Sequence, residues 1–183
     1  MNNFRSSLIV IAVTLASALP LLGQTTRVSP HETISKVIER DRVTIVYGRP
    51  YSKDHKTGEI RKIWGGLVPF GKVWRTGADE ATLLITQKPI VMGGLEVPAG
   101  AFTLFTLPNE DGTAKLIVNK QLGQWGLQYD EKQDLGRAEL TKDMLDNTVD
   151  QFTMVIEKGA TGGGVLRLKW ENTQWSIPFT VAK

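Results

Sequence analysis

The sequence predicts an all-β protein that folds as one antiparallel β-sandwich, jelly-roll-like, of about ten short strands. Apolar and polar residues alternate along many short segments, which is the two-residue period of a strand with one buried face. Turns rich in Gly and Pro separate these segments, and almost no segment has a helical period. Since we find no repeat and no linker, we expect a single domain over residues 24–183.

The first 23 residues have the composition of a secretory signal peptide. A basic residue, Arg5, precedes an apolar run over 8–15, and small residues around Pro20 follow. The apolar run is shorter than the roughly 20 residues that a membrane-spanning helix requires. We therefore expect cleavage near Gly23 and export to the periplasm or the medium, with an uncleaved anchor helix as the alternative.

Composition narrows the classes of function. The 22 basic and 19 acidic residues nearly balance and form no basic run, so we do not expect a nucleic-acid partner. The absence of Cys excludes disulfides, a thiol nucleophile and thiolate metal sites. Only His31 and His55 are present, which argues against a His-rich zinc or copper site. We expect no cofactor and no metal, although a purely carboxylate site for a hard cation stays open.

The predicted strands share alternating apolar residues and are bounded by turn-forming residues. In chain order they are 33–39, 43–50, 81–86, 90–92, 95–97, 101–107, 114–120, 137–141, 152–156, 166–170 and 175–181. Gly93-Gly94 indicates a two-residue hairpin, because Gly supplies the positive φ that such turns need. Further turns are predicted at 41–42, 98–100, 108–112, 162–164 and 171–174, and residues 51–61 and 121–134 are expected to be loops.

Four local features carry more specific expectations. Arg49 continues the buried face of the second strand, so its charge needs a partner or an open rim. Thr141 is a fair N-cap for one helical turn over 141–145. Trp170 and Trp175 flank the predicted turn at 171–174 and could pair across a hairpin. Pro178 cannot donate to a ladder and indicates an edge strand.

The stretch over 63–82 concentrates aromatic and charged residues in a Gly- and Pro-rich loop before an apolar strand. Its run Val73-Trp74-Arg75-Thr76-Gly77-Ala78 is followed by Asp79-Glu80-Ala81-Thr82. Together with Tyr47-x-Arg49-Pro50, Val97-Pro98-Ala99-Gly100 and Gln124-Trp125-Gly126, this run resembles the secreted bacterial domain of unknown function 2911 family over about residues 28–182. The resemblance implies export and a β-rich fold, and it implies no activity. The family usually carries Asn where this chain has Asp79, and a shorter loop where this chain has 51–59.

The sharpest charged cluster is Arg75, Asp79 and Glu80. It could form a polar pocket in which Arg75, with Arg49, binds an anionic or hydroxyl-rich ligand by fork-shaped hydrogen bonds. The other interpretation is an Arg–carboxylate network that fixes the loop to the sheet. We favour that network, because a partly buried Arg must be paired and structural ion pairs are commoner than sites.

Other candidate sites are weaker. Trp64, Trp74 and Trp125 could stack on a sugar or a peptide, but filling the core is the commoner role of Trp. The acids over 130–134 could supply a cation site or a glycosidase pair, although a solvated loop is the simpler explanation. Ser52 and His55 are close in sequence, but no positioned acid accompanies them.

Three functions are therefore compatible with the sequence. The first is a non-catalytic binding or envelope-associated module for an unknown small molecule, glycan or peptide. The second is a hydrolase or lyase with Glu80 or Asp79 as base and Arg75 as anion stabiliser. The third is a structural domain that offers a sheet edge to a partner. The predicted ligand-binding residues are Arg49, Trp74, Arg75, Thr76, Asp79, Glu80, Trp125 and Tyr129.

Overall fold

A computed structural model describes residues 27–182, and the signal peptide predicted over 1–23 lies outside them. Within these residues the protein is all-β, with a single 3₁₀ turn, η1, at Glu131–Gln133. None of the described segments is a helix that could span a bilayer. The strands are β1 His31–Ile38, β2 Asp41–Gly48, β3 Thr82–Thr86, β4 Ile90–Met92, β5 Leu95–Val97, β6 Gly100–Pro108, β7 Ala114–Asn119, β8 Asp134–Lys158 and β9 Gly164–Val181.

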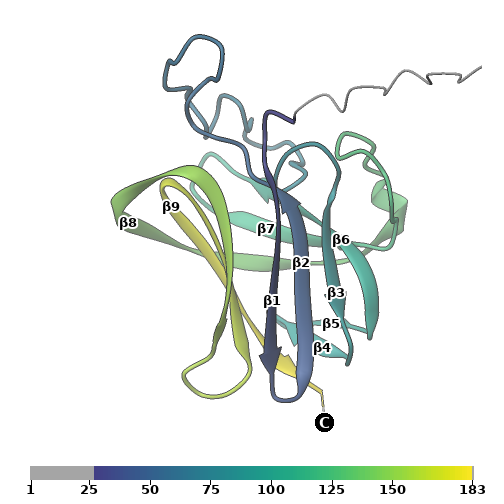
Figure 1. The fold of residues 1–183 in the computed structure, drawn as a ribbon. Helices are drawn as coiled ribbons and strands as arrows, with labels where there is room; N and C mark the ends of the chain where they lie inside the picture. The colour runs from purple at the N-terminus through teal and green to yellow at the C-terminus, as the bar shows by residue number, and fades with distance from the viewer. Residues whose placement is uncertain (1–26, 183) are drawn as a thin grey trace, which may run out of the picture.

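Hydrogen bonding joins the nine strands of the described region into one antiparallel sheet, in the order β1-β2-β3-β6-β7-β8-β9-β4-β5 (Figure 1). The long strand β8 connects the two parts of this sheet. Its residues 134–140 pair with β7, whereas 141–158 pair with β9. Strand β9 in turn pairs with β4 through 179–181. The predicted antiparallel all-β class is confirmed, and the pairing forms one continuous sheet.

One main hydrophobic core is shared by strands from both ends of this order. Ile45 of β2 and Leu84 of β3 are buried in the same cluster as Ile90 of β4 and Ile177 of β9. The sheet must therefore curve around its own core, as Figure 1 shows. Each side chain of this kind contributes about 1.5–3 kcal/mol when it is fully buried. Because the protein has no cysteine, this burial has to hold the fold without disulfides.

Several turns and strands lie where the alternation predicted them, including the β4–β5 hairpin at Gly93-Gly94, whose φ angles are 56° and 88°. The first hairpin turn was predicted at 41–42 but lies at Glu39-Arg40. Both of these residues have positive φ, 48° and 66°, as a two-residue hairpin turn requires. Strand β2 consequently begins two residues earlier than the sequence indicated.

Two predictions in the last third of the chain are wrong. Residues 141–144 form no helical turn, because each pairs with β9, and that pairing outweighs the capping propensity of Thr141. Residues 171–174 form no turn, because β9 continues through them. The irregularity here consists of register shifts in the pairing with β8, around Val149, and of a positive φ of 51° at Glu171.

Pro178 does not mark an edge strand, because β9 has a neighbour on each side. Pairing with β8 ends at Ser176, and pairing with β4 begins at Phe179. Pro178 lies between these two ladders, where its missing N–H removes no ladder hydrogen bond. Its carbonyl still accepts a hydrogen bond from the Gly93 N–H at 2.9 Å.

An aromatic cluster of five residues packs in the core: Trp64, Trp74, Phe152, Trp170 and Trp175. Trp64 makes edge contacts with Trp74, Trp170 and Trp175, with ring centroids 5.9, 6.0 and 4.4 Å away. Trp74 also stacks on Trp170 at 5.7 Å and contacts Phe152 at 5.0 Å. Trp170 and Trp175 thus meet through Trp64 rather than directly across a hairpin. Trp64 and Trp74 pack in the core, as the simpler interpretation of these residues predicted.

Asp41 provides a test of this architecture, because its fully buried carboxylate joins the start of β2 to the end of β3. It accepts hydrogen bonds from the Thr86 hydroxyl at 2.7 Å and from the Gln87 and Lys88 N–H groups at 2.9 and 3.0 Å. Asp41→Ala should lower the free energy of unfolding by about 2–4 kcal/mol, because buried donors lose their acceptor. Urea denaturation measures this loss. The matched control is Asp146→Ala, an exposed site expected to change stability by less than about 0.5 kcal/mol.

Candidate functional site

The loop over 74–80 carries most of the predicted site residues, and its backbone is fixed by other elements. At its start, Trp74 and Thr106 of β6 exchange two N–H···O bonds of 2.8 Å each. Further along, the Ala78 N–H donates to the Gly48 carbonyl at the end of β2, at 3.2 Å. A Cβ on Gly77 would lie 2.8 Å from that same carbonyl oxygen, so the close approach requires glycine there.

Thr76 serves the loop and is not available to a ligand. Its side chain is fully buried, and its hydroxyl lies 2.7 Å from the Thr106 hydroxyl. Its carbonyl accepts a hydrogen bond from the Thr82 hydroxyl at 2.8 Å. Its φ of 53° is unusual for a β-branched residue, so these contacts hold a strained turn in place.

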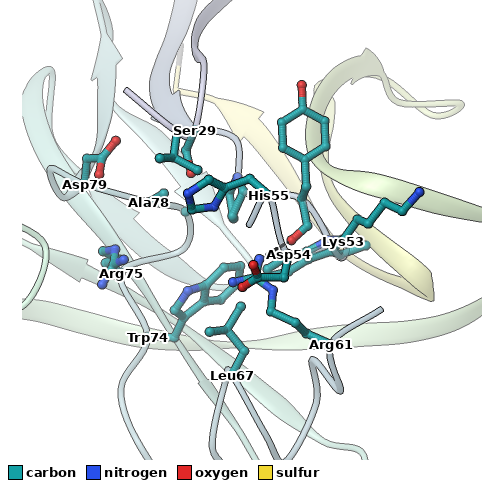
Figure 2. Close-up of a pocket in the computed structure, with 15 residues that line it drawn as sticks. Ser29, Lys53, Asp54, His55, Arg61, Leu67, Trp74, Arg75, Ala78 and Asp79 are labelled. Carbon is teal, nitrogen blue, oxygen red and sulfur yellow. Dashed lines mark hydrogen bonds between the residues drawn. The ribbon is translucent and has the colours of Figure 1, made fainter. Parts of the chain in front are cut away.

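A cavity of about 270 Å³ lies beside this loop (Figure 2). In the view of Figure 2, Arg75 and Asp79 lie on one side of this space and Arg61 and Lys53 on the other. Trp74 lies between them, and Trp170 also contributes to the lining. The remaining lining residues come from the segment before β1 and from the loop after β2: Val28, Ser29, Pro50, Tyr51, Asp54, His55, Leu67, Gly77 and Ala78.

Arg75 has no ion-pair partner among residues 27–182, so the predicted Arg–carboxylate network is not what the structure contains. Its Nε is buried and has no hydrogen-bond acceptor. Burial lowers the pKa of Arg75, and the nearby charge of Asp79 opposes that effect. The acids predicted to pair with it have other partners, which explains the difference.

Gly126 allows Arg75 to lie in this position. A Cβ on Gly126 would be 2.2 Å from Cδ of Arg75 and 2.8 Å from the Asp79 carbonyl oxygen. The Gly126 N–H donates to that oxygen at 2.9 Å. The Gln124-Trp125-Gly126 motif therefore has a steric role, since its glycine is the surface against which the stem of Arg75 packs.

Asp79 and Glu80 belong to a second cluster at the edge of the cavity, together with Arg27 and His31. Arg27 forms two hydrogen bonds to the Glu80 carboxylate, at 2.5 and 2.6 Å. Nε2 of His31 lies 3.2 Å from Oδ2 of Asp79 and 3.4 Å from Oε2 of Glu80. The sequence did not single out Arg27 or His31. The register of the β1–β2 hairpin places His31 opposite Gly48, whose carbonyl binds the loop over 74–80. That register is the signal that could have placed His31 near Asp79 and Glu80.

Arg49 is not among the residues that line the cavity with Arg75. Its Nε donates to the Phe152 carbonyl at 3.1 Å and its Nη2 to the Thr153 hydroxyl at 2.8 Å, both on β8. Its Nη1 lies 3.3 Å from Glu32 of β1. Arg49 therefore has the partners that its position required, and it fixes the β1–β2 hairpin to β8.

Trp125 and Tyr129 also lie outside the cavity lining. The backbone of Trp125 forms a β-bridge with Glu80. Its side chain is 46% exposed, so of Trp64, Trp74 and Trp125 it is the one with a ring surface open to a ligand. Tyr129 packs on Phe105 in a separate small core. Its hydroxyl donates to Asp134 at 2.7 Å, and burial is the main reason that its pKa is raised.

The remaining sequence candidates have structural roles in this fold. Asp134 accepts hydrogen bonds from Asn119 and Arg137, each at 2.9 Å, and Asp130 caps η1 through the Lys132 N–H. These acids are therefore neither free ligands nor an unpartnered catalytic pair. The buried Ser52 hydroxyl donates to the Asp150 carbonyl at 2.9 Å, so it forms no Ser-His arrangement with His55.

The absence of a partner for Arg75 leads to a stability prediction. Arg75→Ala should lower the free energy of unfolding by less than about 1 kcal/mol, because no buried carboxylate is left without its partner. Chemical denaturation of the purified protein measures this difference. A loss of about 3 kcal/mol or more would mean that Arg75 has a buried charged partner after all.

The Arg27–Glu80 pair leads to a second prediction. The hydrogen bond from Arg27 is the main reason that the pKa of Glu80 is lowered, so Arg27→Ala should raise this pKa toward its ordinary value. NMR titration of the Glu80 carboxyl carbon measures the shift. Because the folded-state pKa is lowered, the stabilisation from the pair is present at neutral pH and is lost as pH falls through that pKa. An unchanged Glu80 pKa in the variant would contradict the pairing.

Comparison with protein families matches residues 29–179 to the family described as Protein of unknown function (DUF2911). The matched range contains the loop over 74–80, Arg75 and His31, whereas Arg27 precedes it. No curated protein and no solved structure matches the chain. The family resemblance expected from the sequence is confirmed, while a secreted bacterial origin stays a prediction.

Proposed function

The chain belongs to the DUF2911 family, whose function is unknown, and we propose that it is an exported, non-catalytic module that binds a small organic anion. The anionic group would accept hydrogen bonds from Arg75 in the cavity beside the loop over 74–80. This proposal develops the first of the three functions that the sequence left open.

The observation that carries the proposal is the half-buried guanidinium of Arg75 at the cavity wall, with a buried Nε that has no acceptor. A buried donor without a partner costs about 1–3 kcal/mol, and Arg75 Nε is the one charged group among the five buried side-chain atoms of residues 27–182 that lack a partner. A carboxylate or phosphate would supply the missing acceptors, because the fork of donors on Arg matches two oxygens at once.

The charges around the cavity also favour an anion. Arg75, Arg61 and Lys53 line it, against the two acids Asp54 and Asp79. Arg61 is held in place by hydrogen bonds to the carbonyls of Tyr51 and Ser52, so its charge is fixed near the cavity. A cavity wall with excess positive charge attracts an anion and excludes a cation.

Size and apolar lining define the rest of the ligand. The volume of about 270 Å³ is near the lower limit of ligand pockets, about 300 Å³, which favours a small molecule over a glycan chain or a peptide. Leu67, which is 46% exposed, and the edge of Trp74, which is 9% exposed, give the same space an apolar part, with the buried Trp170 behind them. A small acid with a flat, apolar part would therefore fit better than a strongly hydrated ion.

The two other functions have less support. A general base at pH 7 works best with a raised pKa, whereas Arg27 lowers the pKa of Glu80. Binding of a partner strand along the Pro178 strand would need a free edge, whereas β9 is paired on both sides. These observations leave anion binding as the function that best accounts for Arg75.

NMR titration with benzoate and with phenyl phosphate tests the proposal. Either anion should shift the Arg75 Nε–H resonance, and benzamide, which has no charge, should not. Arg75→Ala should weaken the binding about ten-fold or more, because a hydrogen bond to a charged group contributes about 1.5–3 kcal/mol.

Arg167→Ala is the matched control. Arg167 is also half-buried but is paired with Glu157 at 2.7 Å and lies outside the cavity lining, so binding should be unchanged in this variant. The proposal fails if neither anion shifts Arg75, or if the anions bind Arg75→Ala as well as they bind the unaltered protein.

A further inference from the structure

Three side-chain atoms that can ligate a metal converge where β1 begins and the loop over 74–80 ends. They are Nε2 of His31, Oδ2 of Asp79 and Oε2 of Glu80, and the ligand atoms of these residues all lie within 4.8 Å of one another. The His31 nitrogen is 3.2 Å from the Asp79 oxygen and 3.4 Å from the Glu80 oxygen. Local sequence patterns do not indicate this group, because 48 residues separate His31 from Asp79.

The fold holds this arrangement on its backbone. Pairing of β1 with β2 places His31 opposite Gly48. A Cβ on Gly48 would lie 2.2 Å from the Ala78 carbonyl oxygen and 3.1 Å from His31 Nε2, so only glycine lets the ring and the loop come together. Asp79 has a φ of 65°, in the left-handed region that Asp and Asn tolerate best among residues other than Gly.

A cation of the chain itself already lies among these atoms. Nη1 of Arg27 is 2.5 Å from Oε2 of Glu80 and 2.8 Å from Nε2 of His31. The His31 nitrogen cannot satisfy both of its neighbours. It must be unprotonated to accept from Arg27, and it must carry a proton to donate to Asp79 at 3.2 Å. A metal ion resolves this conflict, because all three atoms can then act as electron-pair donors toward one positive centre.

We propose that His31, Asp79 and Glu80 form a binding site for a divalent ion of borderline softness such as Zn²⁺, and that Arg27 competes with the ion for this site. Zinc bonds of about 2.0–2.2 Å arranged tetrahedrally require ligand atoms about 3.3–3.6 Å apart. The separation of 3.4 Å between His31 Nε2 and Glu80 lies in this range, and that of 3.2 Å to Asp79 is slightly shorter. The two carboxylates balance the charge of the ion. One imidazole and two carboxylates leave a fourth position for water, which is the pattern of open zinc sites.

The metal site does not depend on anion binding in the neighbouring cavity. Asp79 contributes both to the cavity lining and to the cluster, so an ion bound here would add positive charge to the cavity wall. The two proposals nevertheless differ in their essential residues, since Arg75 is not part of the cluster and Arg27 is not part of the cavity lining.

Titration of the purified protein with Co²⁺ and Zn²⁺ tests the site. Co²⁺ should produce the strong visible absorption of tetrahedral coordination, and Zn²⁺ should abolish it. Asp79→Asn and Glu80→Gln should each weaken Zn²⁺ binding, measured calorimetrically, by more than about ten-fold, because even the loss of an outer-shell partner costs about 10–100-fold. Arg27→Ala should tighten binding about five-fold, since it removes an exposed ion pair that competes with the metal.

Glu131→Gln is the matched control for Glu80→Gln. Glu131 is also paired with an arginine, Arg137, at 2.6 Å and lies outside the cluster, so Zn²⁺ affinity should not change. Circular dichroism of each variant separates loss of a ligand from loss of folding, and Asp79→Asn keeps a residue that tolerates the left-handed φ. The site is rejected if neither the unaltered protein nor Arg27→Ala binds either metal, or if Asp79→Asn and Glu80→Gln bind Zn²⁺ normally. Competition is rejected if Arg27→Ala binds no more tightly.

Discussion

Backbone hydrogen bonds from three separate parts of the chain hold the loop over 74–80, and this constraint decides where Arg75, Asp79 and Glu80 lie. Thr106 of β6 fixes the start of the loop, Gly48 of β2 fixes its middle, and Gly126 fixes the carbonyl of Asp79. Between these points the loop has two non-glycine residues with positive φ, Thr76 and Asp79. The charged side chains are therefore directed by a backbone that has little freedom to move.

That constraint separates two neighbouring electrostatic environments. On one side Arg75 lines the cavity without an ion-pair partner among residues 27–182. On the other side Glu80 accepts two hydrogen bonds from Arg27. Asp79 lies at the boundary, lining the cavity while it contacts His31. One loop thus presents the cation Arg75 and the anions Asp79 and Glu80 in different directions. In a flexible loop these opposite charges could approach and neutralise one another.

Local sequence patterns predicted much of the sheet because alternation and turn chemistry are local properties. They failed at 141–145 and 171–174, where pairing between two long strands overrode local propensity. They also located the loop that carries most of the candidate site residues. They could not identify its partners, because Arg27 is 53 residues from Glu80 in sequence and meets it only through the tertiary fold. The expected pairing of Arg75 with its nearest acids was wrong for the same reason.

The position of β9 in the strand order has a consequence for biosynthesis. Strand β4 pairs on one side with β5, which follows it directly in the sequence. On its other side it pairs with the segment 179–181 of β9, some ninety residues later in the sequence. The hydroxyl of Tyr47 similarly accepts a hydrogen bond from the N–H of Met154, which lies 107 residues later in the sequence. The sheet therefore cannot close around its core until residues 179–181 have been synthesised, which makes the pairing of β4 with β9 a late step of folding.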